Sequence, residues 1–163
     1  MAIYEVSGTP VFDVMADIIV CPIAFNGLTD MAITEGFEAY CPEMTDLIHD
    51  ANQKNHITEG MLLCSQLNHA GRIQYVVGMP IKPHFKEAVR ASYVNKGMRS
   101  LYALIKELEA ESIALSLATF CEEELSEDDN IIPYTHNALM ADILALKDRL
   151  EIAGHDITIT LIN

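Results

Sequence analysis

With 163 residues, 50% of them hydrophobic and 21% charged, the chain is long and apolar enough to fold as one domain over residues 1–163. Its 24 acidic and 10 basic residues give a net charge of −14, which opposes broad contact with nucleic-acid phosphates or anionic lipid. Since the N-terminal residues lack a signal-peptide pattern and no apolar run could cross a bilayer, we expect a cytoplasmic protein that does not enter the membrane.

Strand patterns dominate the first half of the chain. Predicted strands cover residues 2–6 (an edge strand), 11–14, 17–24 and 61–64, and a turn at 68–71 leads into a further strand at 73–77. The continuous apolar run at 17–24 is typical of a strand covered on both faces. Two helices separate these strands: one begins near Met31, and the other has Pro42 at its first position and continues through residue 50.

Lys82 is notable because it comes shortly after the predicted strand at 73–77. Gly78 and Pro80 are expected to end that strand shortly before the lysine. Open α/β sheets bind their ligands beyond the carboxyl ends of central strands, which makes Lys82 the first candidate functional residue. A solvated surface lysine is the alternative interpretation.

The second half of the chain continues the alternation of helix and strand. Apolar residues recur at three- and four-residue steps over 93–109, which predicts a helix, and a strand follows at 112–120. Leu139 to Leu150 predict a last helix that ends before Gly154, and residues 157–161 predict a last strand. This alternation predicts an α/β fold in three layers, α/β/α, with a mixed central sheet.

Two predicted loops and the spacing of cysteine and histidine bear on ligands. Residues 25–30 join a strand to a helix, so the helix N-terminus could hold a phosphate, although an ordinary connection explains the loop equally well. The acidic run at 122–130 lacks the turn glycine of a calcium-binding EF-hand loop and indicates a solvated charge run.

No C-x-x-C or H-x-x-x-H pair occurs, so we predict no metal and no cofactor. Reduced, buried thiols are expected at Cys21, Cys41, Cys64 and Cys121.

The order of the elements and two motifs resemble the macro domain, particularly the branch that includes DNA ADP-ribosyl glycohydrolase antitoxins. Residues 17–22 (Asp-Ile-Ile-Val-Cys-Pro) look like the family's Asp-Ala-Ile-Val-Asn-Pro strand. Residues 76–82 (Val-Val-Gly-Met-Pro-Ile-Lys) look like its Ile-Ile-Asn-Phe-Pro-Thr-Lys. The resemblance implies that Lys82 occupies the position of the lysine that, in this branch, attacks the sugar C1 and forms a covalent intermediate.

The resemblance also implies a set of ligand-binding positions, several of which depart from the family pattern. These positions are Gly8, Thr9, Cys21, Asn26, Gly27, Lys82, Thr119 and Phe120. Thr9 replaces the family's adenine-binding aspartate, and Cys21 replaces an asparagine. Three glutamates at 122–124 stand where the family has a glycine-rich loop that grips the diphosphate. Two like charges about 6 Å apart cost about 3 kcal/mol at an effective dielectric constant near 20, so we expect the usual diphosphate grip to be lost.

These observations lead to three hypotheses. The first is a divergent macro-fold binding module, without hydrolysis, that recognises an ADP-ribose-like nucleotide, single-stranded RNA or a protein partner. RNA would use the basic residues Lys82, Lys86, Arg90, Lys96 and Arg99, which otherwise solvate one helix face. The second is an ADP-ribosyl hydrolase with Lys82 as nucleophile and Glu122 or Glu123 as the acid. The third is a self-associating or scaffold-binding protein.

Overall fold

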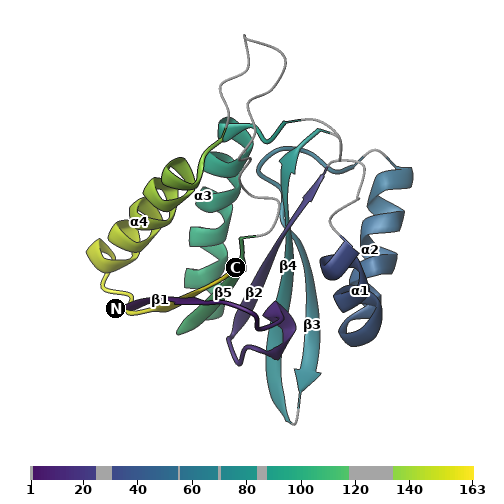
Figure 1. Ribbon diagram of the computed structural model, residues 1–163, viewed down its shortest axis with the longest axis horizontal. Helices are drawn as coiled ribbons and strands as arrows, with labels where there is room; N and C mark the ends of the chain where they lie inside the picture. Colours follow the sequence, from purple (N-terminus) through teal and green to yellow (C-terminus); the bar gives the residue numbers. More distant parts are fainter. Residues whose placement is uncertain (1, 25–30, 55, 70, 84–87, 118–133) are drawn as a thin grey trace.

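The computed structural model describes residues 2–24, 31–54, 56–69, 71–83, 88–117 and 134–163 (Figure 1). The strands are β1 (Ala2–Val6), β2 (Ile18–Ala24), β3 (Leu63–His69), β4 (Arg72–Lys82), β5 (Ser112–Ser116) and β6 (Thr158–Ile162). The helices are the short 3-10 helix η1 (Val11–Asp13), α1 (Met31–Tyr40), α2 (Pro42–Gln53), α3 (Ala91–Leu108) and α4 (His136–Ile152).

The six strands form one mixed sheet in the order β1-β6-β5-β2-β4-β3. All neighbouring strands are parallel except β3, which pairs antiparallel with β4. Figure 1 shows α3 and α4 on one side of the sheet and α1 and α2 on the other. The predicted three-layer α/β fold with a mixed sheet is therefore confirmed.

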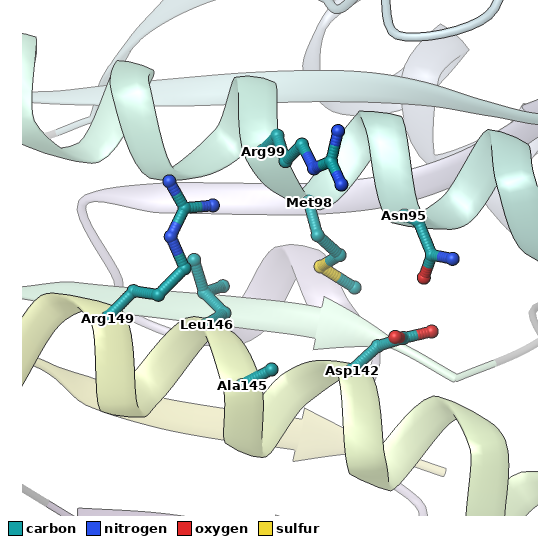
Figure 2. A pocket seen from close by; sticks show the side chains of 7 residues that line it. All are labelled: Asn95, Met98, Arg99, Asp142, Ala145, Leu146 and Arg149. Carbon is teal, nitrogen blue, oxygen red and sulfur yellow. The ribbon is translucent and has the colours of Figure 1, made fainter.

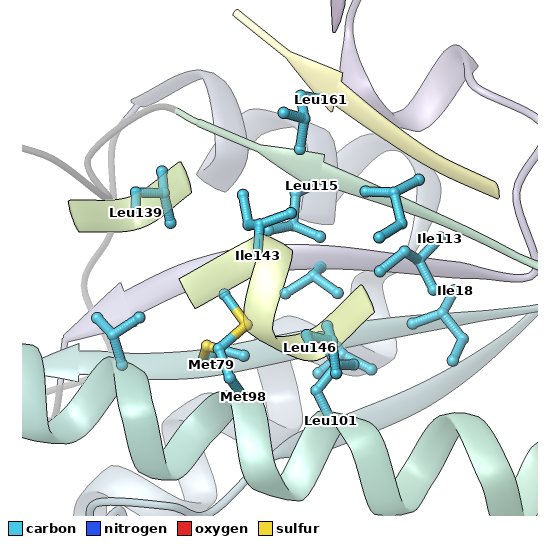
Figure 3. Close-up of a cluster of buried hydrophobic side chains, with 14 of the residues drawn as sticks. Ile18, Met79, Met98, Leu101, Ile113, Leu115, Leu139, Ile143, Leu146 and Leu161 are labelled. Carbon is cyan, nitrogen blue, oxygen red and sulfur yellow. The ribbon is translucent and has the colours of Figure 1, made fainter. Parts of the chain in front are cut away.

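Two hydrophobic clusters hold the layers together, one on each face of the sheet. Side chains such as Leu101 from α3 and Ile143 from α4 pack on Leu115 and its neighbours (Figure 3). On the opposite face, Phe37 from α1 and Met44 from α2 belong to the second cluster. Every residue of β2 is buried, as its unbroken apolar run predicts for a strand covered on both faces.

The predicted extended segment at 11–14 is wrong, because this segment forms η1. The amide of Asp13 donates to the carbonyl of Pro10 (3.0 Å), which closes the short helix. Phe12 packs edge-on against Phe37 and stacks on Tyr40, with ring centroids 5.8 Å apart in both pairs. Tertiary packing therefore decides the conformation of this apolar segment.

The predicted end of β4 is also wrong, because the strand continues through Gly78 and Pro80 to Lys82. The last residue of β4 that pairs with β3 is Gly78, opposite Leu63. Beyond this point β4 has only β2 beside it and is an edge strand on its other side, where a proline is tolerated.

The β3–β4 hairpin differs from the prediction in length. The strand predicted at 61–64 begins at Leu63 and runs to His69, so Asn68 and His69 belong to β3 and not to the turn. Gly71 has a φ of +85°, a conformation that favours glycine and lets the chain reverse directly into β4.

The remaining elements are close to their predicted positions. The predicted edge strand is β1, whereas β6 lies inside the sheet between β1 and β5. The strand predicted at 112–120 ends at Ser116 among the described residues. The Thr135 side chain accepts a hydrogen bond from the amide of Ala138 (3.2 Å) and caps α4, and Gly154, with a φ of +74°, follows its last turn. None of the helices in the described ranges combines the length and the apolar character of a membrane span.

Candidate ligand-binding edge

The five parallel strands end at the same edge of the sheet, which we call the carboxyl edge. Their last residues are Val6, Ala24, Lys82, Ser116 and Ile162. The helices that follow β2 cover one face of the sheet, whereas those that follow β4 and β5 cover the other (Figure 1). After β2 the chain passes to one face of the sheet, whereas after the neighbouring strands β4 and β5 it passes to the other face. In open α/β sheets, the point where neighbouring strands connect to opposite faces marks the ligand-binding position.

Lys82 is the last residue of β4 and lies at this position. It is only 9% exposed, which excludes the interpretation as a solvated surface lysine. The pairing with β2 shifts by one residue between Ile23 and Ala24, so that Lys82 lies opposite Ala24. Such a bulge redirects the side chains at the end of a strand. The amide of Arg90 donates to the carbonyl of Ile81 (3.0 Å), which fixes the start of α3 against the end of β4.

Lys82, at the end of β4, and Ser116, at the end of β5, lie on this common edge. In the sheet, only β2 lies between β5 and β4, which corresponds to about 10 Å between the two strand ends at the usual strand spacing. The amide of Leu117, the first residue after β5, donates to the carbonyl of Ile162 (2.8 Å). The predicted site residues Asn26, Gly27, Lys86, Thr119, Phe120, Glu122 and Glu123 lie outside the described residues, as does Cys121.

Gly8 and Thr9 follow β1, at the far end of the carboxyl edge. Gly8 is exposed and has a φ of +75°. Because β1 and β4 are four strands apart, their ends are separated by about 19 Å at the usual strand spacing. A ligand that contacts both Thr9 and Lys82 has to extend along most of this edge.

Cys21 lies inside β2, opposite Gly78, within the strand predicted at 17–24. It is fully buried among the hydrophobic residues beneath α1 and α2. Cys41 is also a buried free thiol, as predicted, but Cys64 is exposed, which corrects its prediction. Within the described ranges, no three cysteine, histidine, aspartate or glutamate side chains are grouped in a way that could hold a metal ion.

The described members of the predicted basic patch are not brought together. The Nζ of Lys96 lies 2.6 Å from the Oε1 of Glu59, which precedes β3. The guanidinium of Arg90 lies 5.5 Å from the ring centroid of Tyr93. Arg99 instead faces the space between α3 and α4 (Figure 2). These three cations therefore occupy three separate surroundings, and Lys82 is buried.

Sequence reasoning missed a small cavity of about 190 Å³ between α3 and α4. Its lining includes Arg99, which was considered only as part of the basic patch, and residues of α4, of which Leu146 was considered only as part of a predicted helix. Asp142, Leu146 and Arg149 follow one another at four- and three-residue steps and share one helix face. This spacing is visible in the sequence, but only the fold shows that the face meets α3.

The opposite, amino edge of the sheet holds a polar cavity of about 450 Å³ and a network centred on Asp17. The carboxylate accepts hydrogen bonds from the Arg72 side chain (2.6 Å) and the Glu111 amide (2.8 Å). The amide of Asp17 donates to the Ser112 hydroxyl (2.9 Å). Burial alone would raise the pKa of Asp17, but these hydrogen bonds and the charge of Arg72 outweigh it and lower that pKa. The network therefore joins the starts of β2, β4 and β5.

Comparisons with known proteins identify this arrangement of strands and helices. No protein-family model and no curated protein matches the sequence. The macrodomain of Mycobacterium tuberculosis DarG superposes with a TM-score of 0.76 at 16% identity, covering 98% of this chain and 96% of that chain. The macrodomain of Thermus aquaticus DarG gives 0.75 at 17% identity, with 99% and 97% covered. A Trypanosoma brucei macrodomain in complex with ADP-ribose gives 0.61 at 20% identity, with 98% and 62% covered. The chain therefore has the fold of a divergent macrodomain and resembles the DarG macrodomains.

Proposed function

We propose that the chain is a ligand-binding module that holds an ADP-ribose-like nucleotide at the carboxyl edge of its sheet without hydrolysing it. The observation that carries the proposal is the position of Lys82, a nearly buried cation at the end of a central strand in a protein of net charge −14. A cation at the switch point of an α/β sheet attracts an anionic ligand such as a diphosphate. The ADP-ribose complex of the similar Trypanosoma brucei macrodomain supports this class of ligand.

The absence of hydrolysis is proposed from the departures of the sequence from the family pattern. Thr9 offers no carboxylate to an adenine amino group, and the glutamates at 122–124 offer negative charge where the family offers backbone amides. A ligand whose diphosphate is not held closely leaves its sugar imprecisely placed against Lys82, and imprecise placement slows reaction far more than it weakens binding.

Isothermal titration calorimetry with ADP-ribose tests the binding proposal. We expect heat of binding with the wild type and at least roughly tenfold weaker binding with Lys82→Met, which keeps an apolar stem but removes the charge. Lys54→Met is the matched control, because Lys54 is exposed and forms a surface ion pair with Asp50 of α2. Thermal unfolding of each variant establishes that the fold is retained. Absence of binding by the folded wild type at low salt contradicts the proposal.

Hydrolysis is the second candidate function, and the low exposure of Lys82 favours it. In this reaction the Lys82 amine attacks the sugar C1 and the bond to the modified base breaks, while Glu122 or Glu123 donates a proton to the departing base. Water then hydrolyses the covalent intermediate and returns the free amine. Release of labelled ADP-ribose from ADP-ribosylated DNA by the wild type, but not by Lys82→Ala, establishes hydrolysis. Binding without release establishes the module proposed above.

RNA is the alternative ligand for the same module, whereas self-association is a different use of the fold. Filter binding of single-stranded RNA over a salt series, with Arg90→Ala and Lys86→Ala as variants, tests the RNA alternative. Because Arg90, Lys96 and Arg99 lie in separate surroundings, we expect Arg90→Ala to leave any weak RNA binding unchanged. Light scattering of the same samples reports self-association.

A further inference from the structure

The cavity between α3 and α4, which we call the α3/α4 groove, has an apolar floor and a polar rim. Met98 and Leu146 are 5% and 3% exposed, respectively, and belong to the hydrophobic cluster beneath the two helices. Asn95, Arg99 and Arg149 are exposed and line the rim (Figure 2). A groove of this kind offers an apolar contact next to charged hydrogen-bond donors.

Two arginines of this groove have no carboxylate partner in the part of the chain that the structure describes. The ion pairs found there involve other cations, namely Lys54, Arg72, Lys96 and Lys147. The sequence contains 24 acidic residues for 10 basic ones, so acidic groups are abundant. Arg99 and Arg149 nevertheless line a common groove and form no ion pair with any described carboxylate, so we take their donors to be available to an anion.

An aromatic ring holds one of these guanidinium groups in position. The guanidinium carbon of Arg149 lies 4.3 Å from the ring centroid of Tyr102, and the Nζ of Lys106 lies 5.4 Å from the same centroid. Stacking on a ring orders a guanidinium while leaving its edge N–H groups free to bind a carboxylate. The loss of side-chain entropy on binding is therefore smaller than for a freely rotating arginine.

The other end of the groove has the opposite charge. The Asp142 carboxylate accepts a hydrogen bond from the Tyr134 hydroxyl, and Figure 2 shows Asp142 and Asn95 at the end away from Arg149. An anionic group is therefore repelled at Asp142 and attracted at the arginines. An acidic ligand consequently has one preferred orientation in the groove.

The size and lining of the groove indicate which ligand it can hold. Sites for small molecules usually measure about 300–1,000 Å³, so a cavity of about 190 Å³ is suited to a side chain and not to a whole nucleotide. Arginine, tyrosine and methionine are residue types enriched in protein interfaces. The net charge of −14 and the presence of only two groove arginines disfavour a nucleic-acid backbone.

We propose that the α3/α4 groove docks an acidic peptide segment of a protein partner. An apolar side chain of that segment contacts Met98 and Leu146, while neighbouring carboxylates bind Arg99 and Arg149. At physiological ionic strength the Debye length is about 8 Å, so these close contacts persist while the distant negative charges of the protein are largely screened.

Fluorescence anisotropy with a defined peptide tests the proposal on the full chain. The probe is a short labelled peptide in which glutamate alternates with leucine, and its matched control carries glutamine in place of every glutamate. We expect the glutamate peptide to bind more tightly, and each of Arg99→Gln and Arg149→Gln to weaken its binding roughly tenfold. Asp142→Asn should strengthen binding, because it removes the repelling charge and keeps an acceptor for Tyr134.

The control variant is Lys96→Gln, which makes the same charge change in α3 at a residue that pairs with Glu59 and does not line the groove. It should leave peptide binding unchanged. Equal binding of the glutamate and glutamine peptides, or undiminished binding by Arg99→Gln/Arg149→Gln, overturns the proposal. Tighter binding of a labelled RNA that is lost in the double variant overturns it in favour of a nucleic acid. Self-association lost in the double variant overturns it in favour of a second copy.

Discussion

Asp17 connects the starts of three strands, β2, β4 and β5. Its hydrogen bonds reach Arg72 at the start of β4 and Glu111 just before β5, while Asp17 itself directly precedes β2. The side chain is 28% exposed, so water screens the ion pair with Arg72 only in part. We therefore regard this network, and not a surface ion pair such as Lys54–Asp50, as the electrostatic contribution that matters for stability.

The Asp17→Asn variant should be destabilised by about 1–2 kcal/mol at neutral pH, because it loses charge-assisted hydrogen bonds without creating a cavity. The lowered pKa of Asp17 means that its contribution is fully present above its unfolded value of about 3.8. The contribution disappears as the pH falls through the lower pKa of the folded state. Urea unfolding at neutral pH and below pH 3.8 measures the difference between wild type and variant, which should shrink in acid.

The control for this prediction is Asp50→Asn, which breaks an exposed ion pair with Lys54. Its effect should stay below about 1 kcal/mol at neutral pH. An Asp17→Asn variant no less stable than this control would show that the network at the amino edge contributes little.

At the level of elements, α1 packs closely on η1 at Gly36. A Cβ atom added at this position would overlap the ring of Phe12 in η1. The ring itself is held by Phe37 and Tyr40, so it has little room to move. In α3, a Cβ at Gly97 would lie 2.7 Å from the Cγ of Met79, whose chain is flexible.

We predict that Gly36→Ala destabilises the protein by up to about 2 kcal/mol. Overpacking costs about 1–3 kcal/mol, and the better helix propensity of alanine returns about 1 kcal/mol. Gly97→Ala is the matched comparison, and it should lose less stability, because the unbranched Met79 side chain, although fully buried, has more rotatable bonds than Phe12 and can shift further. Urea unfolding at constant m-value measures both variants. An equal loss in the two variants would mean that the Phe12 ring is no more constrained than Met79.

The elements also show what sequence patterns could and could not predict. The helical period over 93–109 is a local signal, and α3 appears where it was expected. The end of β4 was missed because it depends on its pairing with β3, which ends at Gly78. Beyond Gly78 only β2 lies beside β4, so Pro80 is tolerated in the strand. Phe12 was missed for a similar reason, since its contacts come from α1.

The same distinction between local and distant information applies to the candidate site. The position of Lys82 at a strand end was predictable from its own segment, but its low exposure was not. The basic patch was predicted from closeness in sequence, and α3 instead directs Lys96 and Arg99 to different neighbours. The groove facing Arg149 required knowledge that α3 and α4 pack side by side on one face of the sheet.

For the whole molecule, the dominant electrostatic feature is the excess of negative charge, −14 over 163 residues. We predict that raising the ionic strength from about 0.01 M to about 0.15 M increases the free energy of unfolding. The Debye length falls from about 30 Å to about 8 Å over this range, which screens repulsion between distant carboxylates more than contacts between ion-paired atoms. Urea unfolding in sodium chloride measures the effect, and potassium chloride controls for a specific ion. A loss of stability with salt would mean that attractive pairs dominate.

The separation of the two edges of the sheet has a consequence for how this protein can diverge. The residues that tie the strands together, around Asp17, lie at the edge opposite Lys82 and the last residues of β2 and β5. Substitutions at the carboxyl edge do not touch the Asp17 network, so recognition can change over generations while the scaffold is inherited. The same separation makes the chain a suitable recipient for grafted loops, because a new binding specificity can be installed without redesigning the contacts that keep the sheet assembled.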